Sequence, residues 1–234
     1  MTIENFYDQN VYMKEHKMKS YTIKKSTAPV KLDAGWDSEV WGNANEVKVE
    51  FGFDRNSDHT PDVRIKMLHD GDNICGLFRV EDRYILAKAL KDQDMVCRDS
   101  CVEFFVKPAG ADCYFNFEMN CGGTFLLYCC KDLFTKDYLV IPDEDMKTFG
   151  RYHTLPHIIN EEITEPTTWY LGFAIPVAFF EKYAGSKKPL SGQKWTGNFT
   201  KCADCTSHPT WLSWMPLTKC SFHMPEQFGE FIFE

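Results

Sequence analysis

The chain has 234 residues, enough for one large domain or two small ones. It is 44% hydrophobic, 15% aromatic and 26% charged, which is the composition of a folded globular protein. Its formal net charge of −8 argues against a general nucleic-acid binder and against docking on an anionic membrane, because both need a basic surface.

The first segment, residues 1–20, is polar and weakly patterned, and we expect an N-terminal arm there. It has no basic stretch followed by an apolar run, so no signal peptide is visible, and no stretch of the chain is long enough to span a bilayer. The ten cysteines are scattered, and several lie in apolar runs where a thiol acts as a small buried hydrophobe. We therefore expect the thiols to be reduced and the protein to be soluble. We also expect a monomer. The sequence indicates a cytoplasmic location, or a secreted or periplasmic one if a signal was removed.

Period-two alternation of apolar side chains predicts the first strands, at residues 21–25, 44–51, 63–69 and 74–82. The last two are joined by an Asp-Gly turn of the kind that closes hairpins. We expect Trp36 and Trp41 to be buried in the core.

An acidic loop at residues 54–62 separates two of these strands and places oxygen ligands at alternating positions, on Asp54, Asn56 and Asp58. Such ligands suit Ca²⁺. The EF-hand pattern fails, because the sixth loop position is not glycine and the twelfth is Ile65. A calcium site of another type and a solvated turn are the two remaining interpretations.

The alternation of side chains along residues 99–124 predicts a β-hairpin with two different faces. One face is wholly apolar: Val102, Phe104, Val106, Phe115, Phe117 and Met119. The other face mixes aromatic rings with acids and amides: Cys101, Glu103, Phe105, Tyr114, Asn116, Glu118 and Asn120. We expect the second face to be left uncovered, where it can meet a polar ligand; the alternative is an ordinary solvated sheet face.

Further strands are predicted at residues 124–130, 169–175, 192–201 and 230–233, with a short helix at 176–183 that has Pro176 in its first turn. Residues 83–98 and 131–168 are poorly patterned, and we expect connections with some helix. Many short strands indicate an all-β fold, an antiparallel β-sandwich of immunoglobulin-like or jelly-roll type with one or two short helices. We expect one domain over residues 1–234.

Two groups of residues suggest chemistry. Cys202 and Cys205 form a CxxC pair followed by His208, which with a fourth ligand such as Cys220 or Cys75 would suit structural zinc; buried or loop thiols are the alternative. This group defines one hypothesis, a cysteine-rich metal or interaction module. Glu103 and Glu118 could be the paired carboxylates of a glycoside hydrolase, although carboxylates also bind sugar hydroxyls without any reaction.

Several segments resemble family 9 carbohydrate-binding modules: residues 70–82, 99–105 and 117–120, then Trp214 and residues 221–229. Their order covers residues 30–234 and is similar to that of bacterial family 9-like proteins, some of them described as endoxylanases. The resemblance implies a DOMON-like β-sandwich that binds carbohydrate and is more often a binding module than an enzyme. It implies fragments of plant-type polysaccharides, xylan- or cellulose-like, as ligands. No cofactor is required, but structural calcium is frequent.

The resemblance also implies site residues. The family's sugar-binding acid falls on Glu103 and its asparagine on Asn120, while Glu118 stands where the family has arginine. A tryptophan near the C-terminus falls on Phe222, with His223 in the following polar position. The second tryptophan falls in residues 96–98, which offer Arg98 but no ring; Trp195 and Tyr114 are candidates to replace it.

Overall fold

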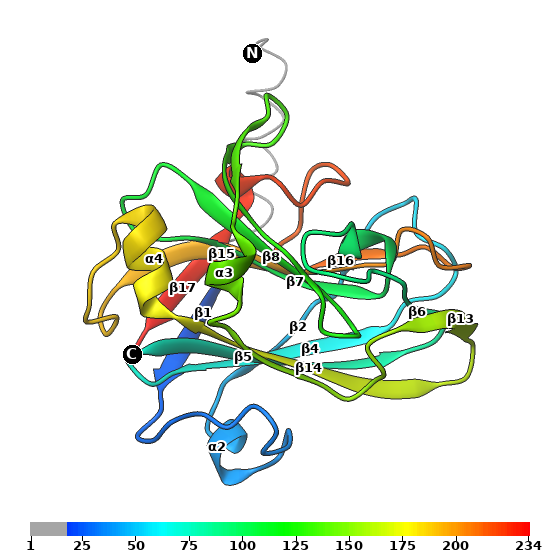
Figure 1. The fold of residues 1–234 in the computed structure, drawn as a ribbon, viewed down its shortest axis with the longest axis horizontal. Coiled ribbons are helices and arrows are strands. Elements are labelled where there is room, and N and C mark those ends of the chain that lie inside the picture. Colours follow the sequence, from blue (N-terminus) through cyan, green and yellow to red (C-terminus); the bar gives the residue numbers. More distant parts are fainter. Residues whose placement is uncertain (1–17) are drawn as a thin grey trace.

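Two curled β-sheets face each other across an apolar core in the computed structural model, which describes residues 18–234 (Figure 1). The first sheet has the order β11 (Asp137–Val140), β10 (Tyr128–Asp132), β8 (Tyr114–Asn120), β7 (Cys101–Lys107), β15 (Lys194–Cys202), β17 (Gly229–Phe233) and β1 (Ser20–Lys25). The second continues from β1 through β4 (Asp62–His69), β5 (Asn73–Asp82), β14 (Thr167–Pro176) and β12 (Gly150–His153).

Strand β1 belongs to both sheets. Its first residues pair with β17, whereas Lys24 and Lys25 pair with β4, and both pairings are parallel. The predicted sandwich is therefore confirmed, but the arrangement is mixed rather than wholly antiparallel. A strand that crosses from one layer to the other closes one side of the core.

Short elements complete the fold. Six further strands are β2 (Glu46–Lys48), β3 (Phe51–Gly52), β6 (Ile85–Ala87), β9 (Phe125–Leu126), β13 (Ile159–Ile163) and β16 (Trp211–Ser213). The helices of the described residues are α2 (Glu39–Gly42), α3 (Asp143–Met146), α4 (Val177–Ala184) and the 3₁₀ turns η1 (Val96–Arg98) and η2 (Pro225–Gln227). The expected helix after Pro176 is α4.

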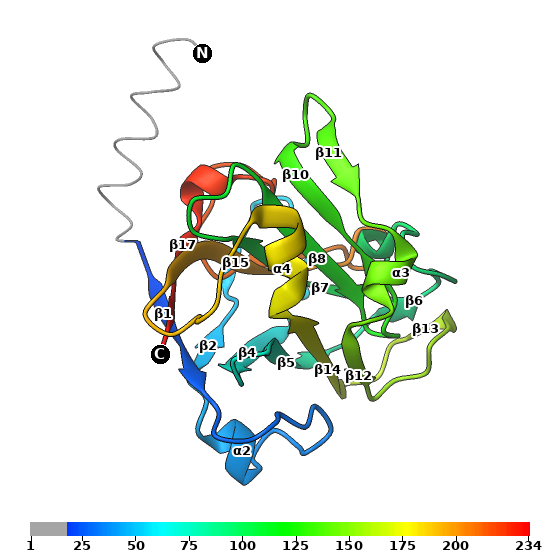
Figure 2. The same cartoon turned by 60° about the vertical axis from the view of Figure 1, so that its left-hand side comes forward.

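The segment 131–168, expected to be mostly loop, contains β11, α3, β12 and β13. Strand β11 lies at the edge of the first sheet, and its side chains are largely exposed on both faces. An edge strand of this kind imposes no apolar alternation on its sequence, so periodicity could not reveal it. Together with β10 it forms a hairpin that extends beyond the rest of the sheet (Figure 2).

The apolar face predicted for the 99–124 hairpin lies in the main core. Phe104 stacks on Phe173 of the opposite sheet, with ring centroids 5.4 Å apart. Trp36 and Trp41 are buried as expected, but in a smaller cluster with Leu68 and Leu77 rather than in the main core.

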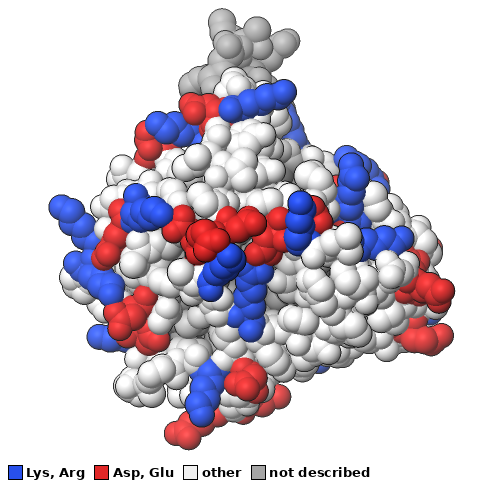
Figure 3. All heavy atoms as spheres, viewed as in Figure 1, with Lys and Arg blue, Asp and Glu red and all other residues white. Residues whose placement is uncertain are grey.

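Residues 1–17 of the expected arm lie outside the described residues, and β1 begins at Ser20. Within residues 18–234, no helix has the length and apolarity needed to cross a membrane. Acidic and basic side chains are interspersed over the face of the molecule seen in Figure 3.

Candidate functional site

The outer face of β7, β8 and β15 is the mixed face predicted for the hairpin. Much of it is covered by the chain that follows β16: Phe222, Met224 and Phe228 pack with Phe105 and Tyr114 in a second apolar cluster. The expectation of an uncovered face is therefore wrong for this part, because apolar side chains more than a hundred residues away seal it.

The remaining part of the face forms the floor of a cavity of about 420 Å³. Glu103 and Glu118 line it, although they are only 2% and 6% exposed, and Asp204 lies with them. Four aromatic side chains contribute to the lining: Tyr128, Tyr138, Trp211 and Phe222. A cavity of acids and rings is the setting that the hairpin pattern suggested.

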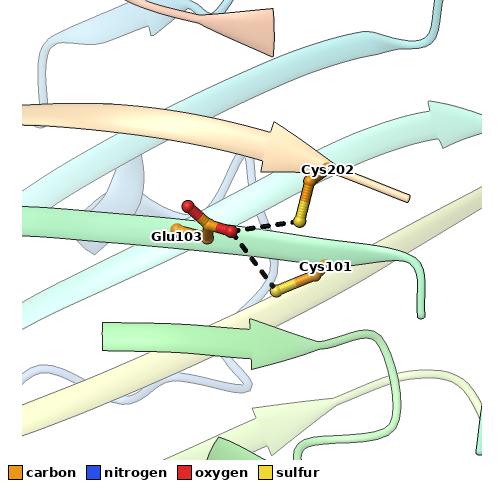
Figure 4. A group of neighbouring side chains, drawn as sticks. All are labelled: Cys101, Glu103 and Cys202. Atoms are coloured by element: carbon orange, nitrogen blue, oxygen red, sulfur yellow. Dashed lines mark hydrogen bonds between the residues drawn. The ribbon is translucent and has the colours of Figure 1, made fainter. Parts of the chain in front are cut away.

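Glu103 and Glu118 are direct cross-strand partners on β7 and β8. The Thr200 hydroxyl donates to Glu103 Oε2 at 2.5 Å, and the Cys202 thiol donates to Glu103 Oε1 at 3.0 Å. Figure 4 shows Cys101 and Cys202 converging on this carboxyl from β7 and β15. Asn116 Nδ2 donates to Glu118 Oε1 at 2.8 Å. The two carboxyls are therefore held in fixed positions.

Burial changes the ionisation of this floor. It raises the pKa of Glu103 to about 7, and it raises the pKa of Glu118 well above its usual value, where the charge of Glu103 adds to the effect. Burial lowers the pKa of His223 to about 4, so this imidazole is neutral at pH 7. The cavity floor can consequently donate as well as accept hydrogen bonds.

The aromatic walls come from elements that sequence patterning did not place at the site. Tyr128 on β10 and Tyr138 on β11 stack on each other with centroids 4.6 Å apart. Trp211 Nε1 donates to Asp204 Oδ1 at 2.7 Å. The amide of Asn56 bonds both backbone groups of Trp211, at 2.9 and 3.0 Å, and so fixes the position of this ring.

Phe222 and His223 line the cavity as the resemblance implied, but two other implied residues do not. Asn120 is fully buried: its Nδ2 donates to Asp99 Oδ2 at 2.8 Å, and its Oδ1 accepts the N–H groups of Gly122 and Thr124. It braces a turn instead of facing a ligand. Arg98 is exposed and lines a neighbouring cavity with Asp99.

The candidates for the missing ring were wrong. Trp195 lies in the main core, where its ring packs against Phe180 and Phe233. Tyr114 is buried in the second apolar cluster, where its hydroxyl is bonded to His223 Nδ1 at 2.9 Å. Trp211 and the tyrosine pair supply the rings that these candidates do not.

The side chains proposed as zinc ligands do not converge on one site. Cys205 is exposed, the His208 ring stacks on Tyr84, and Cys202 faces Glu103. Within the described residues, the one group of three acid, thiol or imidazole ligand atoms that lie within 4.8 Å of each other is Cys101, Glu103 and Cys202.

Two of the calcium candidates, Asn56 and Asp58, have other partners in the structure. Both amide atoms of Asn56 are committed to the backbone of Trp211, and the highly exposed Asp58 lies 3.8 Å from His208 Nε2. Asn56 is therefore not free to act as a calcium ligand beside Asp58.

Carboxyl groups and aromatic rings in a cavity on the outer face of a β-sandwich are the groups that bind sugars in a carbohydrate-binding module. The model of carbohydrate-binding family 9 matches residues 43–233, and the chain belongs to this family. No curated protein matches the chain.

Solved structures agree with this assignment. A protein of Bacteroides uniformis, described as a putative carbohydrate-binding protein, is 30% identical, with a TM-score of 0.83 over 93% of this chain and 100% of that one. Two structures of a family 9 module from Caldicellulosiruptor kristjanssonii share the fold at 14% identity. The one with cellotriose has a TM-score of 0.63 over 92% of this chain and 94% of that one; the one with glucose has 0.62 over 92% and 96%.

Proposed function

We propose that the protein binds a monosaccharide or the end of a short oligosaccharide, of xylan or cellulose type, in the cavity above Glu103 and Glu118. The observation that carries the proposal is the placement of two buried, hydrogen-bonded carboxyls beside three partly exposed rings, Tyr128, Tyr138 and Trp211. A pyranose has one face of C–H groups, which a ring can cover, and a rim of hydroxyls, which carboxyls can bond.

The likeness in fold to modules solved with cellotriose and with glucose supports the same ligand class. Glu103 has a protein donor on each oxygen and Glu118 has one on Oε1, so the orientation of both carboxyls is set before the ligand arrives. Preorganised groups of this kind reject ligands that leave them unpaired.

Binding without turnover fits the ionisation of the pair better than hydrolysis does. The Cβ atoms of direct cross-strand partners lie about 5 Å apart, so the strand pairing alone does not exclude the carboxyl spacing of a retaining mechanism. A retaining hydrolase, however, works best with a fully ionised nucleophile, whereas burial raises the pKa of Glu103 to about 7, so that it is incompletely ionised at pH 7, and raises the pKa of Glu118 well above its usual value. The proposal requires no metal or other cofactor.

Isothermal titration calorimetry with glucose, xylose, cellobiose and xylobiose, in buffer containing EDTA, tests the proposal. We expect saturable binding that Tyr138→Ala and Glu118→Gln each weaken at least about tenfold, which is about 1.4 kcal/mol. Asp112→Asn removes an exposed carboxyl from the β7–β8 turn and is the matched control. Absence of binding to every sugar would overturn the proposal, and turnover of aryl xylosides that either Glu→Gln change abolishes would establish the hydrolase instead.

A further inference from the structure

The cavity gathers three acidic groups, and no lysine or arginine of the described residues lies among its lining residues. The three acids are Glu103, Glu118 and Asp204. His223 is the one imidazole of the lining, and burial keeps it neutral at pH 7. The thiols of Cys97, Cys101 and Cys202 also stay protonated, since burial raises the pKa of each.

Two cations lie near the cavity, but neither of them lies against Glu118. Lys201 points to the other face of β15, where its Nζ donates to the carbonyl of Cys202 and lies 3.5 Å from Asp82. The guanidinium of Arg55 stacks on the Trp211 ring at 4.0 Å, where its charge favours the ionised form of Asp204. No cation therefore lies against Glu118, whose neighbours in charge are the two other acids of the cavity.

One carboxyl oxygen of Glu118, Oε2, accepts no hydrogen bond from the described residues. The other oxygen, Oε1, accepts from Asn116 and lies 3.9 Å from His223 Nε2. The side chain is more than nine-tenths buried and lines the cavity, so Oε2 can be satisfied only from within the cavity. The stacked pair of Tyr128 and Tyr138 adds aromatic rings that attract a cation, whereas the Trp211 ring already holds Arg55.

We infer that the preferred ligand is a saccharide bearing an ammonium group, as a 2-amino-2-deoxyhexose does, with the ammonium donating to Glu118 Oε2. The inference rests on the proposed saccharide site and names the class of sugar that fits it. An ammonium favours the ionised form of Glu118 and donates to an oxygen that the protein leaves free, whereas a neutral hydroxyl supplies only the donor. Charge-assisted hydrogen bonds are about twice as strong as neutral ones.

Calorimetry at pH 6.5 with glucosamine, glucose and N-acetylglucosamine tests this inference. We expect glucosamine to bind roughly tenfold more tightly than glucose, and N-acetylglucosamine to lose that advantage because its nitrogen is an uncharged amide. A bound ammonium favours ionised carboxyls, so glucosamine binding should release protons, measured as a dependence of the binding heat on the ionisation enthalpy of the buffer. Glucose should release none.

Variants separate the charge from the general site. Glu118→Gln should bring the ratio of glucosamine to glucose affinity close to one, while the matched control Asp112→Asn should leave the ratio unchanged. Equal affinities for the three sugars, or tighter binding of glucose, would overturn the inference and leave the saccharide site standing. Failure of all three sugars to bind, together with xylose and cellobiose, would overturn the proposed function itself.

Discussion

Replacing Glu103 with glutamine should change the pH dependence of folding stability. Burial raises the pKa of Glu103 from 4.5 to about 7 in the folded protein. Between these values the folded protein holds a proton that the unfolded chain has released, so the free energy of unfolding falls as the pH rises. At about 1.4 kcal/mol per pKa unit, the shift corresponds to roughly 3 kcal/mol.

His223 acts in the opposite direction. Burial lowers its pKa from 6.5 to about 4, so between these values the unfolded chain holds the extra proton and stability rises with pH. Below pH 6.5 the effects of Glu103 and His223 on the free energy of unfolding oppose each other. Above pH 6.5, of these side chains, only the carboxyls change the free energy of unfolding with pH. Glu118 adds to the fall in stability, because its pKa is also raised.

Urea unfolding of the natural protein and of Glu103→Gln, at intervals from pH 5 to pH 8, isolates the Glu103 effect, since His223 is common to both proteins. We expect the free energy of unfolding of the variant, relative to that of the natural protein, to rise by roughly 3 kcal/mol from pH 5 to pH 8. The gain includes a smaller shift at Glu118, whose pKa should fall when the neighbouring charge is removed. Asp112→Asn should show a constant difference. A constant difference for Glu103→Gln as well would refute the reasoning, because it would mean that Glu103 ionises normally.

Three further changes probe the site and the fold. Trp211→Ala should weaken saccharide binding roughly tenfold in calorimetry, and unchanged affinity would remove this ring from the site. Gly197→Ala should lower the free energy of unfolding by roughly 1–3 kcal/mol, because its Cβ would lie 2.3 Å from the Phe105 carbonyl oxygen; an unchanged urea midpoint would contradict this. Glutathione disulfide should oxidise Cys113 and Cys129, whose sulfurs lie 3.1 Å apart, to an intramolecular disulfide, found by peptide mass spectrometry and lost in Cys129→Ser.

Local pattern was sufficient to predict the sandwich and the two faces of the central hairpin. Strands β4, β5, β7, β8 and β14 all lie where period-two alternation or a buried apolar run placed them. These strands pack one face against the main core, so burial constrains every second residue and leaves a readable pattern. The edge strand β11 lacks that constraint and was missed.

The cavity could be predicted only in part, because its walls come from distant segments. The acids were identifiable from the hairpin, since Glu103 and Glu118 fall on one face by alternation alone. Trp211 was not, because its position depends on hydrogen bonds to Asn56, 155 residues earlier in the chain. Asn120 was assigned to the ligand by resemblance, whereas its carboxylate partner Asp99 and the turn after β8 use its amide fully.

Under the proposed preference for an amino sugar, the burial that raises the pKa of the carboxyl pair would also be the source of the selectivity of the site. In open solvent Glu103 and Glu118 would be ionised at pH 7 and would attract any cation weakly. In the cavity burial favours the protonated forms of the unliganded pair, so a bound cation displaces protons and then interacts at short range with little screening by water. A neutral sugar meets protonated acids and displaces none. The proposal therefore predicts that the same two residues accept both kinds of sugar and that pH sets the preference between them.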